Sequence, residues 1–275
     1  MFRRLRLKTP AELRAMRPAG EATAALLASV RERLAVGATP LELDAVADEV
    51  IRSHGGRSNF RLVPGYRHAV CVSVDDDVVH GIPDDRLFAP GALVSVDGGV
   101  EIDGWNGDAA FSAVLPDPER PDVVAARSQL VRAAEDALWA GIAALAGARH
   151  LNEVGEAIEE SVEASGPFGI VEGYGGHGIG RSMHEEPSVH NHSVRGRGPR
   201  VRPGLVVAIE PMIVAGHPDT FVREDGWTVA TVDGSDAAHV EHSVAVHGAG
   251  IWVLTAPDGG VGGLEPFGVR PVPIS

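Results

Sequence analysis

The segment from Val94 to Phe111 constrains the fold of this chain more than any other, because it predicts a β-hairpin that places two acids, Asp97 and Asp108, on one face. Asp103-Gly104 lies between two runs that suit extended backbone, and Asp-Gly is a strong short hairpin signal. Side chains alternate between the faces of a strand, so a two-residue turn places Asp97 opposite Ala110, with Asp108 one diagonal step away on the same face. Two carboxylates that converge among apolar neighbours repel each other unless a shared proton or a cation neutralises them. The alternative is an edge open to water, where both acids are solvated.

Composition limits the class of protein. A chain of 275 residues can form one large domain or two small ones, and a formal net charge of −14 argues against general affinity for nucleic acid or anionic membranes. Cys71 is the only cysteine, so no intrachain disulfide can form, which suits a reducing compartment. No segment resembles a signal peptide or reaches the ~18 apolar residues of a membrane span. We therefore expect a soluble cytoplasmic protein that binds neither a membrane nor a specific nucleic acid.

Helices and antiparallel strands are expected to follow one another twice along the chain, at an offset of about 110 residues. Helices are predicted from Thr9, resuming after Pro18 and ending near Leu34, then from Thr39 to His54, at about Asp122–Ala146 and at about Leu151–Ala164. Extended segments are predicted at Phe60–Leu62, at Ala69–Val74, in the hairpin, and near Leu205–Glu210, Gly226–Val232 and His239–Val246. We expect an α+β fold in one catalytic domain over residues 1–275, with pseudo-repeats at about 9–115 and 122–250 and a C-terminal tail at 255–275.

Four further segments place a histidine or a glutamate at the end of a strand or in a glycine-rich loop. They hold His80 in V-V-H-G-I-P, His177 in G-G-H-G-I-G with His184 in H-E-E-P just after it, Glu210 in I-E-P-M, and Glu241 in H-V-E-H. Each has a structural explanation when taken alone. A histidine in a glycine loop is often bonded to backbone, Glu210 could pair with Arg200 or Arg202, and Glu241 could lie on a solvated edge.

Taken together, four carboxylates and one imidazole favour a metal site formed by Asp97, Asp108, His177, Glu210 and Glu241. A set dominated by oxygen with one nitrogen suits Mn, Fe, Co or Zn, and it lacks the thiolates of a structural zinc site. Five side chains exceed what one catalytic ion needs, so two divalent ions that share carboxylates are expected. Such a pair acidifies a water molecule and stabilises an oxyanion, which is what hydrolysis of an unactivated amide requires.

The motifs, in their order, closely resemble those of type I methionine aminopeptidases. They are K-T-P-A-E-L, V-V-H-G-I-P-D, V-D-x₁₀-D, G-H-G-I-G-x₃-H-E-E-P, I-E-P-M and E-H-S, from about Lys8 to Leu254. The resemblance implies the pita-bread fold, in which two pseudo-symmetric halves pack helices on a curved antiparallel sheet. It also implies a cytoplasmic monomer that removes the initiator methionine from nascent polypeptides with a small second residue, and a transient ribosome contact is a further expectation.

The same resemblance implies roles for individual residues. The five predicted ligands would hold two metal ions, with Asp108 and Glu241 bridging them. His80 would contact the scissile amide, His184 would stabilise the carbonyl and the tetrahedral intermediate, and Glu210 would also shuttle a proton. The methionine pocket would be lined by Tyr66, Cys71, Met183 and Trp227.

Several positions depart from the family pattern. Asp75-Asp76 replaces a usual Asn-Glu and leaves open whether a monovalent-cation site exists there. Met183 replaces an aromatic residue found in many members, and Phe60 and Val63 also differ, but the pocket is still expected to be apolar and sized for methionine.

Two alternatives remain. An X-Pro aminopeptidase or prolidase would use the same five ligands, but those enzymes usually carry a large N-terminal domain, for which no room is expected before Thr9. A pita-bread protein that only binds partners would have lost metal ligands, and here all five stand.

Overall fold

The predicted hairpin lies at the centre of the molecule. In the computed structural model, which describes residues 5–275, strands β4 (Leu93–Ile102) and β5 (Trp105–Val114) pair antiparallel along their whole length. The turn residues Asp103 and Gly104 have φ of 51° and 76°, the left-handed geometry that favours Asp-Gly in a two-residue hairpin loop. Asp97 pairs with Ala110 and Asp108 with Gly99, so the predicted register is confirmed.

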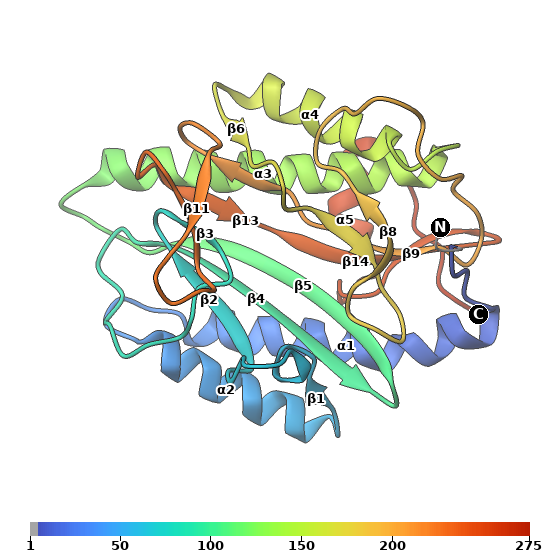
Figure 1. The fold of residues 1–275 in the computed structure, drawn as a ribbon, viewed down its shortest axis with the longest axis horizontal. Coiled ribbons are helices and arrows are strands. Elements are labelled where there is room, and N and C mark those ends of the chain that lie inside the picture. The colour runs from blue at the N-terminus through green and yellow to red at the C-terminus, as the bar shows by residue number, and fades with distance from the viewer. Residues whose placement is uncertain (1–4) are drawn as a thin grey trace.

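A nine-stranded sheet is built around this hairpin, and every strand pair in it is antiparallel (Figure 1). Its order is β1 (Arg57–Ser58), β4, β5, β14 (Glu241–His247), β9 (Val206–Ile209), β7 (Gly176–Gly178) and β8 (Glu185–Val189), with β2 (Val70–Val74) beside β4 and β15 (Gly250–Val253) beside β14. Two three-stranded sheets accompany it. They join β13 (Ala237–His239), β10 (Met212–Val214) and β6 (Gly169–Ile170), and β11 (Thr220–Val222), β12 (Val229–Thr231) and β3 (Asp77–Val79).

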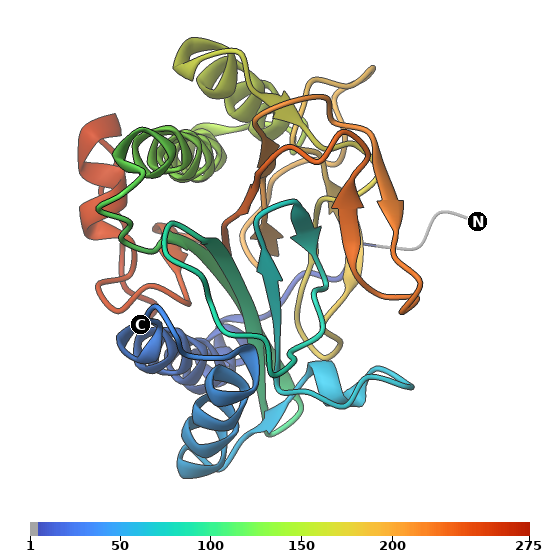
Figure 2. The same ribbon diagram turned by 90° about the vertical axis from the view of Figure 1, so that its left-hand side faces the viewer.

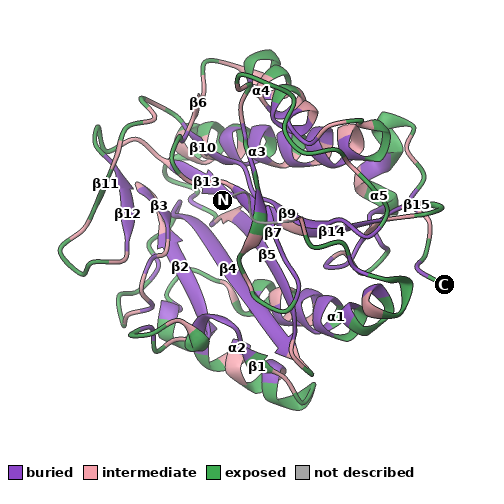
Figure 3. Cartoon of the chain, turned by 45° about the vertical axis from the view of Figure 1, so that its right-hand side comes forward, coloured by how far each residue is buried: buried purple, intermediate pink, exposed green. Residues whose placement is uncertain are grey.

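Two helix pairs cover the same outer face of the curved sheet side by side, one from each half of the chain (Figure 2). They are α1 (Pro10–Arg33) with α2 (Pro40–Ser53), and α3 (Pro121–Gly147) with α4 (Glu153–Ser165). Each pair packs its buried face on the strands, and Figure 3 shows that the strands are buried over most of their length while the outer helix faces are exposed. The α+β prediction is therefore confirmed. Among residues 5–275, no helix combines the length and the apolarity needed to cross a membrane.

Helix α1 differs from its prediction because it runs through Pro18 without a break. Pro18 lies on the exposed face of the helix, so the carbonyl of Arg14, which loses its helical partner, can bond to water instead. Both helices of the first half begin with a capping box, formed by Thr9 with Glu12 and by Thr39 with Glu42.

The segment Phe60–Leu62 was predicted to be extended, and this prediction is wrong. It forms a 3₁₀ turn, in which the Val63 N–H donates to the Phe60 carbonyl at 2.9 Å. The buried Asn59 before it donates its side-chain amide to the Gly107 carbonyl of β5, which fixes the turn against the hairpin. Three residues are too few for periodicity to distinguish such a turn from a strand.

The C-terminal segment packs on both halves of the fold. It contains α5 (Val261–Leu264) and the 3₁₀ turn η2 (Glu265–Phe267). Leu264 is buried in the core beneath α3, and Ile274 is buried against Leu13 and Met16 of α1.

Candidate metal centre and adjoining pocket

All five predicted ligands converge in one cavity of about 160 Å³. They come from neighbouring strands, and each is at most 9% exposed. Asp97 lies on β4, Asp108 on β5, His177 on β7, Glu210 directly after β9, and Glu241 at the start of β14. The hairpin prediction explains part of this convergence, because Ala110 pairs with Asp97 on one side and with Glu241 on the other.

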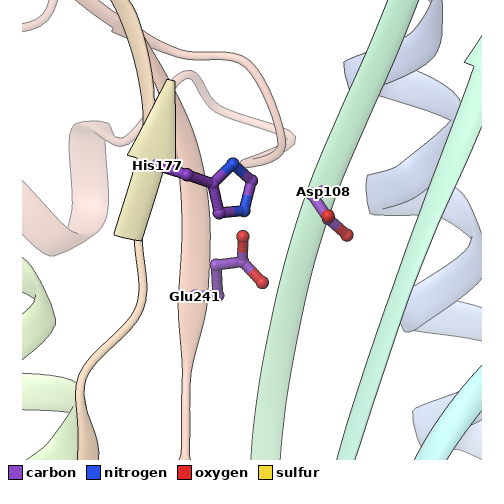
Figure 4. Close-up of side chains that lie close together, drawn as sticks. All are labelled: Asp108, His177 and Glu241. Carbon is purple, nitrogen blue, oxygen red and sulfur yellow. The ribbon is translucent and has the colours of Figure 1, made fainter. Parts of the chain in front are cut away.

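The tightest group in the cavity is formed by Asp108, His177 and Glu241 (Figure 4). One potential ligand atom from each of them lies within 4.8 Å of the other two. The His177 Nε2 atom is also 3.4 Å from Glu210 Oε1. His177 Nδ1 is 3.0 Å from the Gly178 carbonyl, so this nitrogen donates and Nε2 keeps its lone pair toward the carboxylates.

The electrostatics of the cluster favour a cation. Burial raises the pKa of Asp108 to about 8, and burial together with the neighbouring carboxylates raises the pKa values of Asp97, Glu210 and Glu241 well above their usual range. Burial, followed by His184, lowers the pKa of His177 to about 4, which keeps its imidazole neutral. Buried acids that are difficult to ionise, beside a neutral histidine, are typical of a site that binds divalent cations, because a bound cation would stabilise the ionised carboxylates.

The donor atoms also fit such a cation. Asp97 Oδ1 and Asp108 Oδ1 are buried without a hydrogen-bond partner, and among residues 5–275 no arginine or lysine pairs with any of the four acids. The structural explanations considered for the two glutamates are therefore wrong. In the described chain the basic side chains beside Glu210 are the neutral His177 and His239 and no arginine, and Glu241 is 2% exposed, far from solvated.

An apolar pocket opens onto the acids in the same cavity. Its apolar lining consists of Phe60, Val63, Tyr66, Cys71, Val79, Met183 and Trp227. Tyr66 contacts Phe60 and Trp227 edge to face at 6.2 and 5.1 Å between ring centroids, and its hydroxyl donates to the Val70 carbonyl at 2.8 Å. Cys71 pairs with Asp97 between β2 and β4, so the pocket and the acids share adjacent strand positions.

Two further predicted residues, His80 and His184, lie at the same cavity. His80 follows β3 with φ of 61°, a conformation that non-glycine residues seldom adopt outside tight turns and functional sites. The ring of His184 lies 4.3 Å from that of His177, edge to face. Burial lowers the pKa of both residues, so both imidazoles are neutral near pH 7 and can donate a hydrogen bond from one nitrogen.

Sequence reasoning missed His239. It is 1% exposed, and its Nε2 lies 3.7 Å from Glu210 Oε2 without a hydrogen-bond partner. Burial, followed by His80, lowers its pKa to about 3. The signal was available, because residues two apart along extended backbone share a face and His239 is two residues before Glu241.

Comparison with known proteins identifies the family. A model of metallopeptidase family M24 matches residues 14–248. Methionine aminopeptidase 1 of Mycobacterium tuberculosis is 44% identical over 257 residues, which cover 90% of this chain and 94% of that protein. Methionine aminopeptidase 1 of Bacillus subtilis is 35% identical over 248 residues, which cover 90% and 98%.

Similar solved structures support the same family assignment. The methionine aminopeptidase of Thermotoga maritima superposes with a TM-score of 0.86 at 36% identity, over 92% of this chain and all of that one. A prolidase from Pyrococcus furiosus has the same fold, with a TM-score of 0.71 at 18% identity over 90% of this chain and 65% of that one. These likenesses confirm the pita-bread fold and the resemblance that the motifs carried. The chain therefore belongs to metallopeptidase family M24.

Proposed function

We propose that this chain is a dinuclear metalloaminopeptidase that removes an N-terminal methionine from nascent proteins and prefers a small second residue. The observation that carries the proposal is one cavity in which an apolar pocket opens directly onto four buried carboxylates and a histidine. The relatives named methionine aminopeptidase, which align over most of both chains, support the same activity.

Two divalent ions, from among Mn, Fe, Co and Zn, would be held by Asp97, Asp108, His177, Glu210 and Glu241, with Asp108 and Glu241 shared between them. When bound, such ions supply an acidified water and an electrophile for the scissile carbonyl. The two acids of the hairpin belong to the first half of the chain and the other three residues to the second half. We infer a single catalytic domain over the whole chain, because neither half holds the complete set.

The protein groups around the ions have separate tasks. Glu210 would take a proton from the attacking water and pass it to the leaving amine, since it lies between the candidate metal centre and His239. His184 would donate a hydrogen bond to the carbonyl oxygen as negative charge develops on it, and His80 would contact the scissile amide. The lowered pKa values of both histidines support these donor roles, because each imidazole needs no added proton near pH 7.

The pocket supports a preference for an unbranched side chain. Methionine is flexible and polarizable, and it packs well on the Tyr66 and Trp227 rings and on the Cys71 thiol. Met183 supplies an adaptable wall where a rigid ring would fix the width. A β-branched valine or a charged lysine would fit this lining poorly, and a misplaced methylene in an apolar pocket changes discrimination by roughly 1–3 kcal/mol.

A peptide panel tests the proposal. The metal-free protein is assayed on Met-Ala-Ser, Met-Gly, norleucine-Ala, Val-Ala, Lys-Ala, Leu-Ala and Ala-Pro peptides, with each metal added back in turn. We expect turnover only with metal, and fastest on Met-Ala, Met-Gly and the norleucine peptide. Faster turnover of Ala-Pro or Leu-Ala would leave a metallopeptidase but overturn the methionine assignment in favour of X-Pro or broader specificity. Binding of peptides without turnover under every metal would favour a binding protein.

A contact with the ribosome is a separate part of the proposal. Arg195, Arg197, Arg200 and Arg202 are exposed on one loop, beside the exposed Arg149, and none of them forms an ion pair with a described residue. Backbone hydrogen bonds tie this loop to the turn between α3 and α4, for example from Leu151 N–H to the Pro199 carbonyl at 2.9 Å. Phosphates of ribosomal RNA are a suitable partner for ordered arginines on an otherwise acidic protein.

Co-sedimentation with ribosomes at increasing salt tests this contact. We expect wild type to co-sediment at low salt, and the Arg197→Glu, Arg200→Glu variant to do so more weakly, with unchanged peptide turnover. Equal co-sedimentation of both proteins would remove this surface from the proposal. Light scattering of the same samples without ribosomes tests the expected monomer.

A further inference from the structure

The only lysine of the chain, Lys8, is buried. Its side chain is 3% exposed, and its ammonium group lies 2.9 Å from a carboxylate oxygen of Glu185, whose side chain is 11% exposed. Its backbone N–H donates to the Gly204 carbonyl at 2.7 Å, which fixes the segment that precedes α1. Lysine is seldom buried unless it is paired, so the contact with Glu185 is what allows Lys8 to be buried here.

Glu185 connects this lysine to the loop that carries His184. One carboxylate oxygen accepts the Lys8 bond, and the other accepts the backbone N–H groups of Arg181 at 2.8 Å and Ser182 at 3.2 Å. Both oxygens are thus occupied, and the turn from Arg181 to Glu185 is closed on the carboxylate. Burial tends to raise the pKa of Glu185, but the Lys8 bond and the two backbone donors outweigh it and lower that pKa, so the carboxylate is ionised at neutral pH.

The lysine stem also packs against the other end of the turn. A side-chain carbon at Gly180 would lie 2.5 Å from Lys8 Cε, so the loop and the stem are already in contact. His184 and Glu185 are adjacent where β8 begins, and adjacent residues of an extended segment point to opposite sides. Glu185 therefore faces Lys8 while His184 faces His177 and the cavity.

We propose that Lys8 is a positioning residue for His184, and that it acts through the Glu185 carboxylate and the turn that this carboxylate closes. The inference rests on the proposed function for the role of His184, and it adds a task for the segment before the first helix. A merely structural role would be to hold that segment against the second half of the chain. The positioning role and the structural role predict different effects of a Lys8 substitution on turnover in a protein that already lacks His184.

The first test is a double-mutant cycle with Lys8→Met, which removes the charge and keeps a long apolar stem. We expect kcat on Met-Ala-Ser to fall by about 10- to 100-fold, the effect of a small misplacement of a catalytic group, with KM and metal affinity by calorimetry nearly unchanged. In the His184→Ala background the same substitution should change kcat by less than about 2-fold, because residues that act as a unit are not additive. An equal fall of kcat in both backgrounds would overturn the proposal.

A matched control uses a second ion pair that is largely buried and lies away from His184. Arg127 pairs with Asp236 through bonds of 2.7 and 2.9 Å, and its side chain is 15% exposed. Arg127→Met should lower the melting temperature without selectively reducing kcat, and its effect should be the same with and without His184.

A second variant tests the proposal if Lys8→Met folds poorly because the buried Glu185 carboxylate is left unpaired. The Lys8→Met, Glu185→Gln protein leaves no buried charge unpaired and retains an acceptor for the turn. We expect it to be at least as stable as Lys8→Met, with the same selective loss of kcat. Wild-type kcat in this double variant would contradict the proposal.

A measurement on the metal-free protein separates this proposal from the proposed function. The imidazole signals of His184, assigned by their loss in His184→Ala, are recorded by NMR. We expect them to shift in Lys8→Met and to stay in place in Arg127→Met, whatever substrate the protein acts on. Unchanged His184 signals in Lys8→Met would refute the positioning role even if methionine aminopeptidase activity is found.

Discussion

Replacing Asp108 by asparagine should stabilise the metal-free protein while abolishing its stabilisation by metal. Burial raises the pKa of Asp108 to about 8, against 3.8 for an ordinary aspartate. Well below pH 3.8 this group is neutral in both the folded and the unfolded chain, so it has no effect. Between pH 4 and pH 8 the unfolded chain loses the proton while the folded chain keeps it, so stability falls as the pH rises. Each pKa unit is worth roughly 1.4 kcal/mol, which gives up to about 4 kcal/mol at pH 7.

Thermal and urea unfolding in EDTA provide the assay, at pH 4 and pH 7, for wild type and Asp108→Asn. At pH 7 the variant should be more stable by up to about 4 kcal/mol, a rise in melting temperature of roughly 10 °C for a chain of this size. At pH 4 the difference should fall below about 1 kcal/mol. Added Mn²⁺ should reverse the order at pH 7, because only the wild type retains the shared carboxylate. Asp85→Asn, at an exposed position, is the matched control, and it should change neither the stability in EDTA nor the stabilisation by Mn²⁺. A variant equal to or less stable than wild type in EDTA at pH 7 would refute the reasoning that these acids are strained in the absence of a cation.

Two further predictions concern single residues. His184→Ala should retain both metal ions in elemental analysis, yet its kcat/KM should fall by a factor that corresponds to about 2.7 kcal/mol or more of transition-state stabilisation. Loss of metal in that variant would instead make His184 a metal ligand. Gly104→Ala should destabilise the protein by about 1 kcal/mol in urea unfolding, because Gly104 has φ of 76° and an added Cβ would lie 2.7 Å from the Arg181 guanidinium. An unchanged urea midpoint would show that the hairpin turn tolerates a side chain.

The sequence predicts the hairpin well because its signals are local. The Asp103-Gly104 turn fixes the register, and the two-residue alternation then decides that Asp97 and Asp108 share a face. The gathering of His177, Glu210 and Glu241 on that face depends on pairing between strands far apart in the chain, and in the sequence it could be inferred only from the chemistry of the set and from the family motifs.

Features that depend on tertiary contacts were harder to predict. Pro18 is a helix breaker by its own chemistry, and only its exposed position allows α1 to continue through it. The Phe60–Leu62 turn is held by the buried Asn59, whose partner lies in another strand. The burial of Lys8 against Glu185 joins residues 177 positions apart, and no local pattern in the basic N-terminal segment indicates it.

The most direct test of the account is the anomalous difference density of crystals grown with Mn²⁺. The central claim is that the five convergent side chains hold the two ions that the hydrolysis needs. It predicts two peaks in the cavity, one beside Asp97 and one beside His177 and Glu210, with Asp108 and Glu241 between them. A map without peaks at these side chains, or one whose peaks are bound by His80 and His184, would contradict the account.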